Sequence, residues 1–403
     1  MSILGEARKL WRSALPEPVR KFAAPVLNQA LEAYVRAAAR APHGAERPQG
    51  PIKMVGYFSG SHGIAASARL GARAFEAIGV QVERVDVTDA KLDWSGRLTA
   101  PQSASAWIFH LNPPELLAAL ACLGPKQLLG PRYGYWAWEL PRAPRRWLKD
   151  AALVDEVWAP SRYTADALAG AAAPVRVVPH PLFMEDYAKV RPAPRRAAFQ
   201  GVAIFDFNSS LARKNPQGAI TAWVQAFGAD PDCQLTLKTQ NGAAHPQALA
   251  ELTALAPPNV RLVDEVWPYA DVQRLIAGAD VLVSLHRAEG FGLTPAEAMA
   301  LGTPVLATGW SGVMDFMDID SAVLVPSTQV KVKDPQGIYS GQSWAEPDLA
   351  AAARGLQQLR AEPALRKRLA KVGRQRVAER LSPQAWFETL PASVREAVRA
   401  ATL

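Results

Sequence analysis

The sequence predicts an α/β protein with two Rossmann-like domains. Two segments carry this prediction, because residues 52–79 and residues 281–302 each show an apolar strand pattern, a glycine-containing loop and a helix pattern in that order. The length agrees with it, since 403 residues with 49% hydrophobic content can fill two cores of ordinary size. Cys122 and Cys233 are the only cysteines and lack metal-ligand spacing, which argues against a disulfide framework and a zinc site.

The net charge of +8 is concentrated in two segments. Residues 1–40 carry a net charge of +4 and residues 351–380 carry +7, so the rest of the chain is slightly acidic. These basic segments come without a nucleic-acid-binding motif, and we therefore expect no nucleic-acid partner. An anionic membrane surface is the better candidate for a charge-driven partner.

Residues 1–50 are predicted to form a helical extension and a linker. Trp11, Phe22 and Tyr34 are interleaved with basic side chains, and two prolines are expected to divide the segment into two helices. Such helices could lie on an anionic membrane or pack on the body of the protein, and the sequence leaves both alternatives open. With no run of eighteen apolar residues and no secretory signal, we expect a cytoplasmic protein, on the inner face of the membrane if the first alternative holds.

The first domain is expected over residues 51–190 and begins with a strand, a loop and a helix. The loop contains Gly60, His62 and Gly63 but lacks the G-x-G-x-x-G pattern, so binding of a nicotinamide dinucleotide is disfavoured. The elements expected in order are a strand at Ile52–Phe58, a helix to Ala77 that ends at Gly79, and strands at Val80–Val87, Trp107–His110, Asp155–Ser161 with a helix cap, and Val175–Val178.

Two features of this domain carry candidate ligand-binding residues. His110 ends an apolar run, where an imidazole is either a structural residue or a group near a substrate. The aromatic cluster that contains Trp136, Trp138 and Glu139 could stack on a sugar acceptor, or its indole rings could fill the core. The residues alone do not decide between these alternatives.

The second domain is expected over residues 191–381, after a linker near Lys189–Arg196. Arg213, Lys214 and Asn215 stand directly before a predicted helix, and positive side chains beside a helix N-terminus suit a pyrophosphate. The alternative is a pair of solvated surface charges. We expect strands at Ala197–Phe205, Gln234–Lys238 and Val260–Leu262 and helices at Gln217–Phe227 and Ala270–Ala277. Further along the chain, Gln329–Ser343 interrupts this pattern and Trp344–Asp348 is expected to restart a helix. The basic helices expected over residues 349–380 should be mostly solvated.

The segment from Val281 to Asp315 contains the strongest candidate site. A strand at Val281–Leu285 leads through a glycine loop into a short helix that ends at Gly302, and a second strand follows at Pro304–Ala307. Glu289 and Glu297 flank the loop-to-helix junction, where free amides favour an anion and carboxylates suit sugar hydroxyls. Thr294 and Glu297 could equally form a capping box without any ligand.

The run Glu289-Gly-Phe-Gly-Leu-Thr-Pro-Ala-Glu297-Ala-Met-Ala-x-Gly-x-Pro-Val resembles the E-x7-E signature of retaining GT-B glycosyltransferases, in particular glycosyltransferase family 4. The resemblance covers roughly residues 51–400 and implies two domains facing a central cleft, with the last helix, in 382–403, returning to the first domain. It implies that Glu289 contacts the donor sugar and that Glu297 holds the ribose. Gly290, Phe291, Gly292 and Leu293 lie between them in the implied donor site.

The resemblance assigns further roles. Lys214 matches a lysine that neutralises the leaving diphosphate, whereas the Asp206–Ser210 region occupies the position of the family's upstream arginine, and Arg213 is the candidate substitute. His110 matches a histidine near the reacting sugar, and the loop with Gly60 and Gly63 would face the donor phosphates and acceptor. The weaker acceptor candidates are His62, Trp136, Trp138 and Glu139.

The implied activity is transfer of a hexose from a nucleotide-sugar, such as mannose from GDP-mannose, to a glycan or lipid-linked acceptor in polysaccharide biosynthesis, with retention of configuration. We expect no metal or other cofactor for this activity. The alternative is a catalytically silent sugar-nucleotide-binding protein of the same fold.

Overall fold

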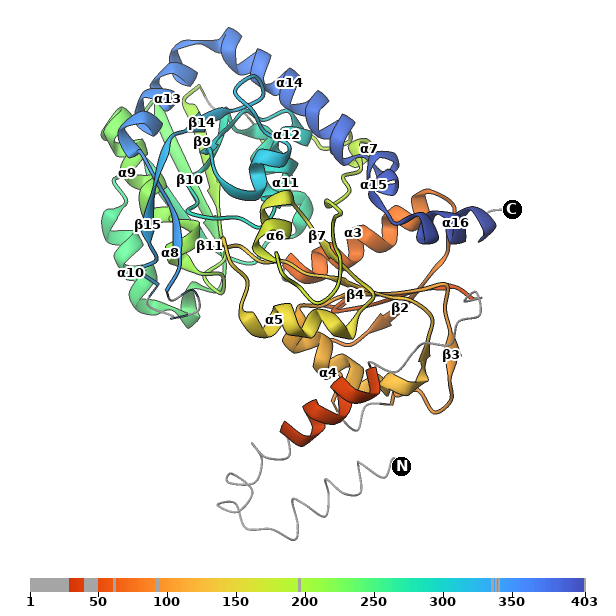
Figure 1. Cartoon of the computed structure of the whole chain (residues 1–403). Coiled ribbons are helices and arrows are strands. Elements are labelled where there is room, and N and C mark those ends of the chain that lie inside the picture. The colour runs from red at the N-terminus through yellow and green to blue at the C-terminus, as the bar shows by residue number, and fades with distance from the viewer. Residues whose placement is uncertain are drawn as a thin grey trace.

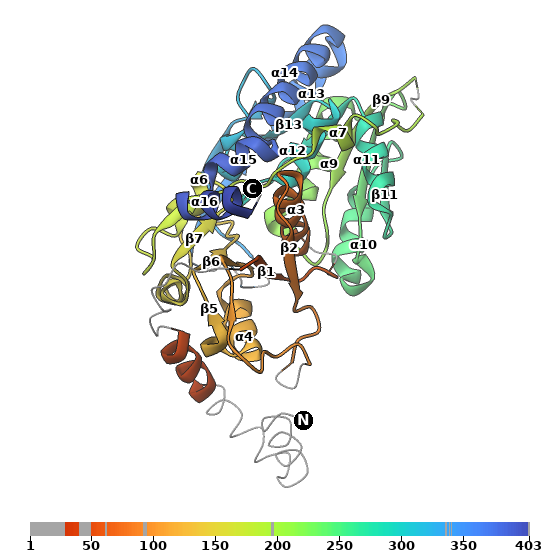
Figure 2. The same ribbon diagram turned by 90° about the vertical axis from the view of Figure 1, so that its right-hand side faces the viewer.

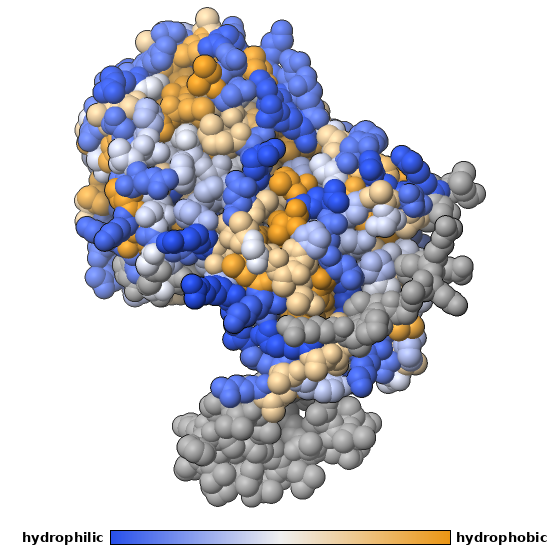
Figure 3. All heavy atoms as spheres, viewed as in Figure 1, coloured by the Kyte–Doolittle hydropathy of each residue, from blue (hydrophilic) through white to orange (hydrophobic). Residues whose placement is uncertain are grey.

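The computed structural model describes residues 29–39, 50–60, 63–91, 95–194, 197–334, 337, 339 and 341–401. These residues form two α/β domains, and the outline of the molecule narrows between them on the face shown in Figures 1 and 3. Each domain is built on a six-stranded parallel sheet. The fold predicted from the sequence is therefore confirmed.

The first sheet has the strand order β2-β1-β4-β6-β7-β8. Its core contains Met54, Ile108 and Trp158, all almost fully buried. The strands are β1 (Ile52–Gly56), β2 (Val82–Asp86), β4 (Ala106–His110), β6 (Arg132–Tyr135), β7 (Glu156–Ala159) and β8 (Val175–Val177), with short strands β3 (Gln102–Ser103) and β5 (Leu128–Leu129) beside them. The helices of this domain are α3 (Gly63–Ala77), α4 (Pro113–Leu123), α5 (Arg145–Asp150) and α6 (Arg162–Ala167).

The second sheet has the strand order β11-β10-β9-β12-β13-β14, the usual doubly wound order, which places β9 and β12 side by side at its centre. Its strands are β9 (Phe199–Ile204), β10 (Cys233–Thr239), β11 (Val260–Asp264), β12 (Val281–Ser284), β13 (Val305–Thr308) and β14 (Val323–Val325). Its helices are α8 (Leu211–Lys214), α9 (Pro216–Phe227), α10 (Pro246–Leu255), α11 (Tyr269–Gly278), α12 (Leu293–Leu301), α13 (Leu349–Ala361) and α14 (Pro363–Leu381).

Two connections cross between the domains. The first connection contains helix α7 (Met184–Tyr187) and leads from the first domain to β9. The second leads from α14 back to the first domain through α15 (Pro383–Thr389) and α16 (Ala392–Ala401), a path visible in Figures 1 and 2. Trp386 and Val394 of this returning segment are buried in the core beside Phe75, which meets the Trp386 ring edge-on at 4.9 Å between ring centroids. The C-terminal helices therefore pack on the first domain.

The predicted helix restart at Trp344–Asp348 is wrong. Residues Ser343–Pro347 form strand β16, which pairs antiparallel with β15 (Ser327–Lys331), and α13 begins only after Asp348, whose side chain accepts from the amide of Ala351 at 2.9 Å. The segment has too few residues for a helical period to appear, and its conformation is set by the partner strand. The interruption seen in the sequence thus contains two paired strands, β15 and β16, which we call the hairpin and which lie outside both parallel sheets.

A helix over residues 29–39 packs on the first domain. Val35 and Ala39 are 1% exposed and belong to its core cluster, and Arg36 pairs with the buried carboxylate of Asp150. For this part of the N-terminal segment the structure supports packing on the body of the protein. Residues 1–28, which carry the remainder of the membrane hypothesis, lie outside the described residues. Among the described residues, no helix is both long and apolar enough to span a membrane.

Removing residues 1–40 is expected to lower the melting temperature by about 5–10 °C, because the buried carboxylate of Asp150 would lose its pairing with Arg36 and the core would lose its apolar cover. Removing residues 1–28 leaves these contacts in place, so this shorter deletion is the matched variant for the membrane question. If the segment binds anionic lipid, the full chain will sediment with anionic liposomes more than the shorter protein at low salt, and less as salt rises. Equal sedimentation of the two proteins would exclude the membrane role of residues 1–28.

Candidate active site

A pocket of about 410 Å³ lies at the carboxyl ends of β9 and β12 and is lined by residues of both domains. In an open parallel sheet this edge is where ligands bind. Nine of the residues singled out in the sequence line it: Gly63, Glu139, Arg213, Lys214, Glu289, Gly290, Phe291, Gly292 and Leu293.

An ion-pair cluster centred on Glu289 occupies this pocket. Lys214 Nζ lies 2.5 Å from Glu289 Oε1, and Arg213 Nη1 lies 3.2 Å from Oε2. Burial by itself would raise the pKa of Glu289, but the charges of Lys214 and Arg213 outweigh it and lower the pKa to about 2. Glu289 is therefore a carboxylate throughout the physiological pH range, held beside two cations.

The chain around Lys214 has a local reason for its shape. Helix α8 is a single turn with Ser210 as N-cap, and Asn215 then adopts a left-handed conformation, φ 53°, that ends α8 and starts α9. The Asn215 side chain is buried, accepts from the amide of Gly218 at 3.1 Å and donates to the carbonyl of Leu285 at 2.9 Å. These bonds give Asn215 a structural role in fixing α9 to the end of β12, in place of the donor contact suggested by the sequence.

Both domains hold the loop that carries Glu289. The amide of Glu289 donates to Ser311 Oγ at 2.9 Å. The carbonyl of Gly290 accepts from Ser161 Oγ at 2.5 Å and from Thr164 Oγ1 at 3.2 Å. Ser161 and Thr164 belong to the start of α6 in the first domain. The loop is thus fixed at the domain boundary before any ligand binds.

Gly292 ends this loop with a φ of 94° and is the N-cap of α12, where a Cβ atom would lie 2.4 Å from Val313 Cγ1. Substitution with alanine is expected to cost about 2–4 kcal/mol of stability and to weaken nucleotide binding, since backbone strain and a steric clash act together at the pocket wall. Gly302, at the other end of α12, has a φ of 78° and open space around it, so Gly302→Ala is the control for strain alone. Equal melting temperatures and nucleotide affinities for the two variants would contradict this account.

The capping-box alternative for Glu297 is wrong. Gly292, not Thr294, is the N-cap of α12, and no side chain caps this helix start. Glu297 accepts instead from the hydroxyl of Tyr269 on α11, one helical turn beyond the pocket-lining residues Leu293 and Thr294. Burial raises the pKa of Glu297 to about 7, and the Tyr269 hydrogen bond only partly offsets it.

His110 lies behind the pocket wall. It is 4% exposed, its Nδ1 is 3.1 Å from Ser67 Oγ, and its ring stacks on Tyr135 at 4.6 Å between centroids, while Ser67 and Tyr135 themselves line the pocket. Burial, followed by the neighbouring His180, lowers the pKa of His110 to about 3, so the imidazole is neutral. A direct contact of His110 with a sugar is not part of this arrangement, and its role in the reaction stays a prediction.

Sequence reasoning missed His180 as a pocket residue. His180 lines the pocket, its Nδ1 lies 3.2 Å from the Tyr135 hydroxyl, and burial lowers its pKa to about 4. Its ring meets Phe291 of the second domain edge-on at 4.8 Å between centroids. The available signal was its position, directly after the last strand of a parallel sheet.

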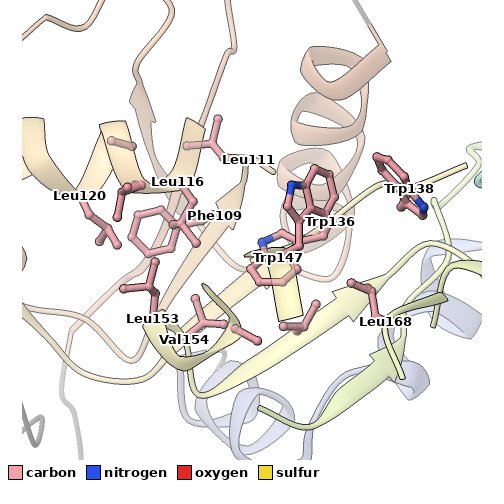
Figure 4. Packing of buried hydrophobic residues seen from close by; sticks show 14 of the residues in the cluster. Phe109, Leu111, Leu116, Leu120, Trp136, Trp138, Trp147, Leu153, Val154 and Leu168 are labelled. Carbon is pink, nitrogen blue, oxygen red and sulfur yellow. The ribbon is translucent and has the colours of Figure 1, made fainter. Parts of the chain in front are cut away.

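The aromatic cluster divides between core and pocket. Trp136 is fully buried and Trp138 is 7% exposed, and both pack against Trp147 in the core of the first domain (Figure 4). Stacking of these two rings on an acceptor sugar is therefore contradicted, because their faces are already covered by protein. Glu139, by contrast, lines the pocket, and its Oε1 lies 3.8 Å from Arg213 Nη2.

The first glycine loop is only partly described. Gly63 lines the pocket at the start of α3, whereas the carbonyl of Gly60 accepts from Arg69 Nη1 at 2.7 Å in a turn. His62 lies outside the described residues. Within the described part of the chain, no group of three or more His, Cys, Asp or Glu side chains is arranged to hold a metal ion.

Comparisons with known proteins agree with this architecture. Residues 206–336 match the family model described as "Glycosyl transferases group 1", which covers the loop with Lys214 and the Glu289–Glu297 segment. No curated protein sequence matches the chain. The matched residues lie within the second domain and include both Lys214 and Glu289.

Solved structures share the fold at low sequence identity. Sucrose-phosphate synthase from Thermosynechococcus elongatus aligns with a TM-score of 0.61 at 17% identity, over 87% of this chain and all of that one. Anabaena HepE, solved with UDP and glucose, aligns with a TM-score of 0.60 at 13% identity, over 88% and 100%. TarM of S. aureus, solved with UDP and α-GlcNAc-glycerol, gives 0.52 at 14% identity over 71% of this chain, which spans about half, 54%, of TarM. The protein thus has the GT-B fold.

Proposed function

We propose that the protein is a glycosyltransferase that moves a hexose from a nucleotide-sugar to a glycan or lipid-linked glycan acceptor, with retention of configuration. The observation that carries the proposal is the cluster of Glu289, Lys214 and Arg213 in a pocket lined by both domains at the carboxyl edge of the second sheet. Its cations suit a diphosphate, and its carboxylate suits sugar hydroxyls.

The reaction breaks the bond between sugar C1 and the diphosphate oxygen, and the bonding electrons leave with the diphosphate. Lys214 Nζ and the free amides at the start of α12 would stabilise this growing negative charge. The acceptor hydroxyl would enter on the same face, bond to C1 and give its proton to the departing diphosphate, which yields retention without a protein nucleophile. Glu289 would bind the hydroxyls of the transferred sugar, and Glu297 those of the ribose.

Two sources suggest the donor to test. GDP-mannose is the donor suggested with the family resemblance, whereas HepE and TarM were both solved with UDP. A polysaccharide precursor, free or carried on a lipid, is the proposed acceptor class. The proposed donor site is compatible with either nucleoside diphosphate, because Glu289, Lys214 and Arg213 would bind the sugar and the diphosphate, and other residues would bind the base.

Release of nucleoside diphosphate from a panel of GDP- and UDP-sugars tests the proposal. The purified protein is expected to hydrolyse its matching nucleotide-sugar slowly without acceptor and faster with glycan acceptors. Tight binding of a nucleotide-sugar without any release, with and without acceptors, would favour a catalytically silent sugar-nucleotide-binding protein. Neither binding nor release across the panel would contradict both.

A further inference from the structure

Two buried aromatic residues tie the β15–β16 hairpin to the core of the first domain, although the hairpin follows the second sheet in sequence. Tyr339 and Trp344 are 6% and 2% exposed and join the same apolar cluster as Trp136 and Trp147. The Tyr339 ring meets Trp138 edge-on at 5.8 Å between centroids. The hairpin therefore joins the two domains next to the pocket.

The tip of the hairpin reaches Arg213 both through Glu139 and through the Tyr339 hydroxyl itself. The Tyr339 hydroxyl donates to Glu139 Oε2 at 3.2 Å, and Glu139 Oε1 lies 3.8 Å from Arg213 Nη2. Arg213 is 5% exposed, donates to the carbonyl of Ala288 at 2.9 Å and pairs with Glu289. Its guanidinium thus lies between two carboxylates, one from each domain.

The base of the hairpin fixes the same region from the opposite side. Glu346 forms a two-bond ion pair with Arg287, at 2.6 and 2.8 Å, and Arg287 Nη1 donates to the carbonyl of Ala212 at 2.5 Å. The Arg287 amide donates to the carbonyl of Arg213 at 2.8 Å. The hairpin therefore reaches the backbone of α8 through Arg287, and the buried side chain of Arg213 through Tyr339 and Glu139.

We propose that Glu139 and Tyr339 are positioning residues: they hold the Arg213 guanidinium between the two domains, so that Arg213 pairs less tightly with Glu289 and the Glu289 carboxylate can bind the donor sugar. The physical reason is competition. Without the negative charge of Glu139, Arg213 would pair more tightly with Glu289 and withdraw its carboxylate oxygens from the sugar hydroxyls. Tyr339 acts in two ways, by orienting the Glu139 carboxylate and by its own contact with the Arg213 side chain. This inference rests on the proposed transferase function and names residues that tune it.

The variants Glu139→Gln and Tyr339→Phe test the inference, and Gln342→Ala is the control. Gln342 lies in the same hairpin and exchanges hydrogen bonds with the backbone of Arg142 at 3.1 and 2.8 Å on the exposed side, away from Arg213. Each variant would be measured for kcat and KM of donor hydrolysis, for nucleoside diphosphate affinity and for melting temperature. Hydrogen exchange at residues 211–216 and 288–292 supplies a readout that does not require turnover.

We expect kcat to fall about tenfold in Glu139→Gln and about twofold to tenfold in Tyr339→Phe, with diphosphate affinity and melting temperature nearly unchanged. The kcat of the double variant should fall by less than the product of the two single effects, because Tyr339 acts partly through Glu139. Exchange in the two loops should rise in both variants and stay at the wild-type level in Gln342→Ala. If the wild type turns over but Glu139→Gln is as fast, the positioning role is wrong while the proposed function stands. If the wild type turns over no nucleotide-sugar, the proposed function is wrong. Hydrogen exchange in Glu139→Gln that is the same as in wild type would then reject the positioning role as well.

Discussion

Replacing Lys214 with methionine is expected to lower the turnover of the nucleotide-sugar by about 10²–10³-fold, the usual cost of removing one preorganised charge from a transition state. Lys214 is the cation closest to Glu289, with its Nζ 2.5 Å from Oε1, and its side chain remains partly accessible from the pocket. Arg213 is already shared between Glu289 and Glu139 and cannot take over the charge of the departing diphosphate. Lys214→Arg should therefore recover part of the lost rate.

Steady-state kinetics of the three proteins checks this, with Lys371→Met as the control. Lys371 is an exposed lysine on α14, so its loss changes net charge without touching the pocket. A rate for Lys214→Met within about threefold of wild type would mean that Lys214 does not stabilise the leaving group.

The variant Glu297→Gln is expected to bind nucleoside diphosphate about ten- to a hundredfold more weakly, since a carboxylate that accepts from two ribose hydroxyls loses charge-assisted bonds of about 1.5–3 kcal/mol when it is neutralised. A loss of affinity in this variant could not be attributed to a lost helix cap, because Glu297 does not cap α12 and accepts instead from Tyr269. Glutamine can still accept from Tyr269, so the fold should survive. Calorimetric titration that returned wild-type affinity would refute the ribose contact.

A pH dependence follows from the same residue. Because the pKa of Glu297 is raised to about 7 in the folded protein, the native state binds more protons than the unfolded chain between the ordinary pKa and 7. This residue's contribution therefore makes stability decline as pH rises towards 7, and Glu297→Gln should lose that decline. The nucleotide affinity of the wild type should rise between pH 6 and 8, because the Glu297 carboxylate forms in that range. The rise should be smaller in Glu297→Gln, which serves as the control for titration of the phosphate itself. Parallel pH profiles for the two proteins would show that Glu297 does not titrate against ligand.

Much of the donor side of the pocket could be predicted from sequence. Lys214 and Glu289 are 75 residues apart, yet each follows one of two strands that a doubly wound sheet places at its centre, β9 and β12. The E-x7-E resemblance and the small-residue loops pointed to the same edge. Local rules failed for Thr294 only because Gly292 can adopt the left-handed conformation and start the helix earlier.

The first-domain side could not be predicted in the same way. Whether Trp136 fills the core or faces a ligand depends on Trp147, which packs against it from another element. His180 and Tyr135 meet only after the sheet has formed. The hairpin tip, with Tyr339 against Glu139, joins segments 200 residues apart, and nothing in its local pattern announces this contact.

The central claim is that Lys214 and its surroundings bind the diphosphate of a nucleotide-sugar, and one titration series tests it directly. Nucleoside diphosphate and monophosphate of the same base, uridine or guanosine, would be titrated calorimetrically into wild type and Lys214→Met. We predict that wild type prefers the diphosphate of one base by about tenfold or more and that this preference largely disappears in Lys214→Met, because the second phosphate then lacks its cation. An equal preference in both proteins, or no nucleotide binding by wild type, would contradict the claim.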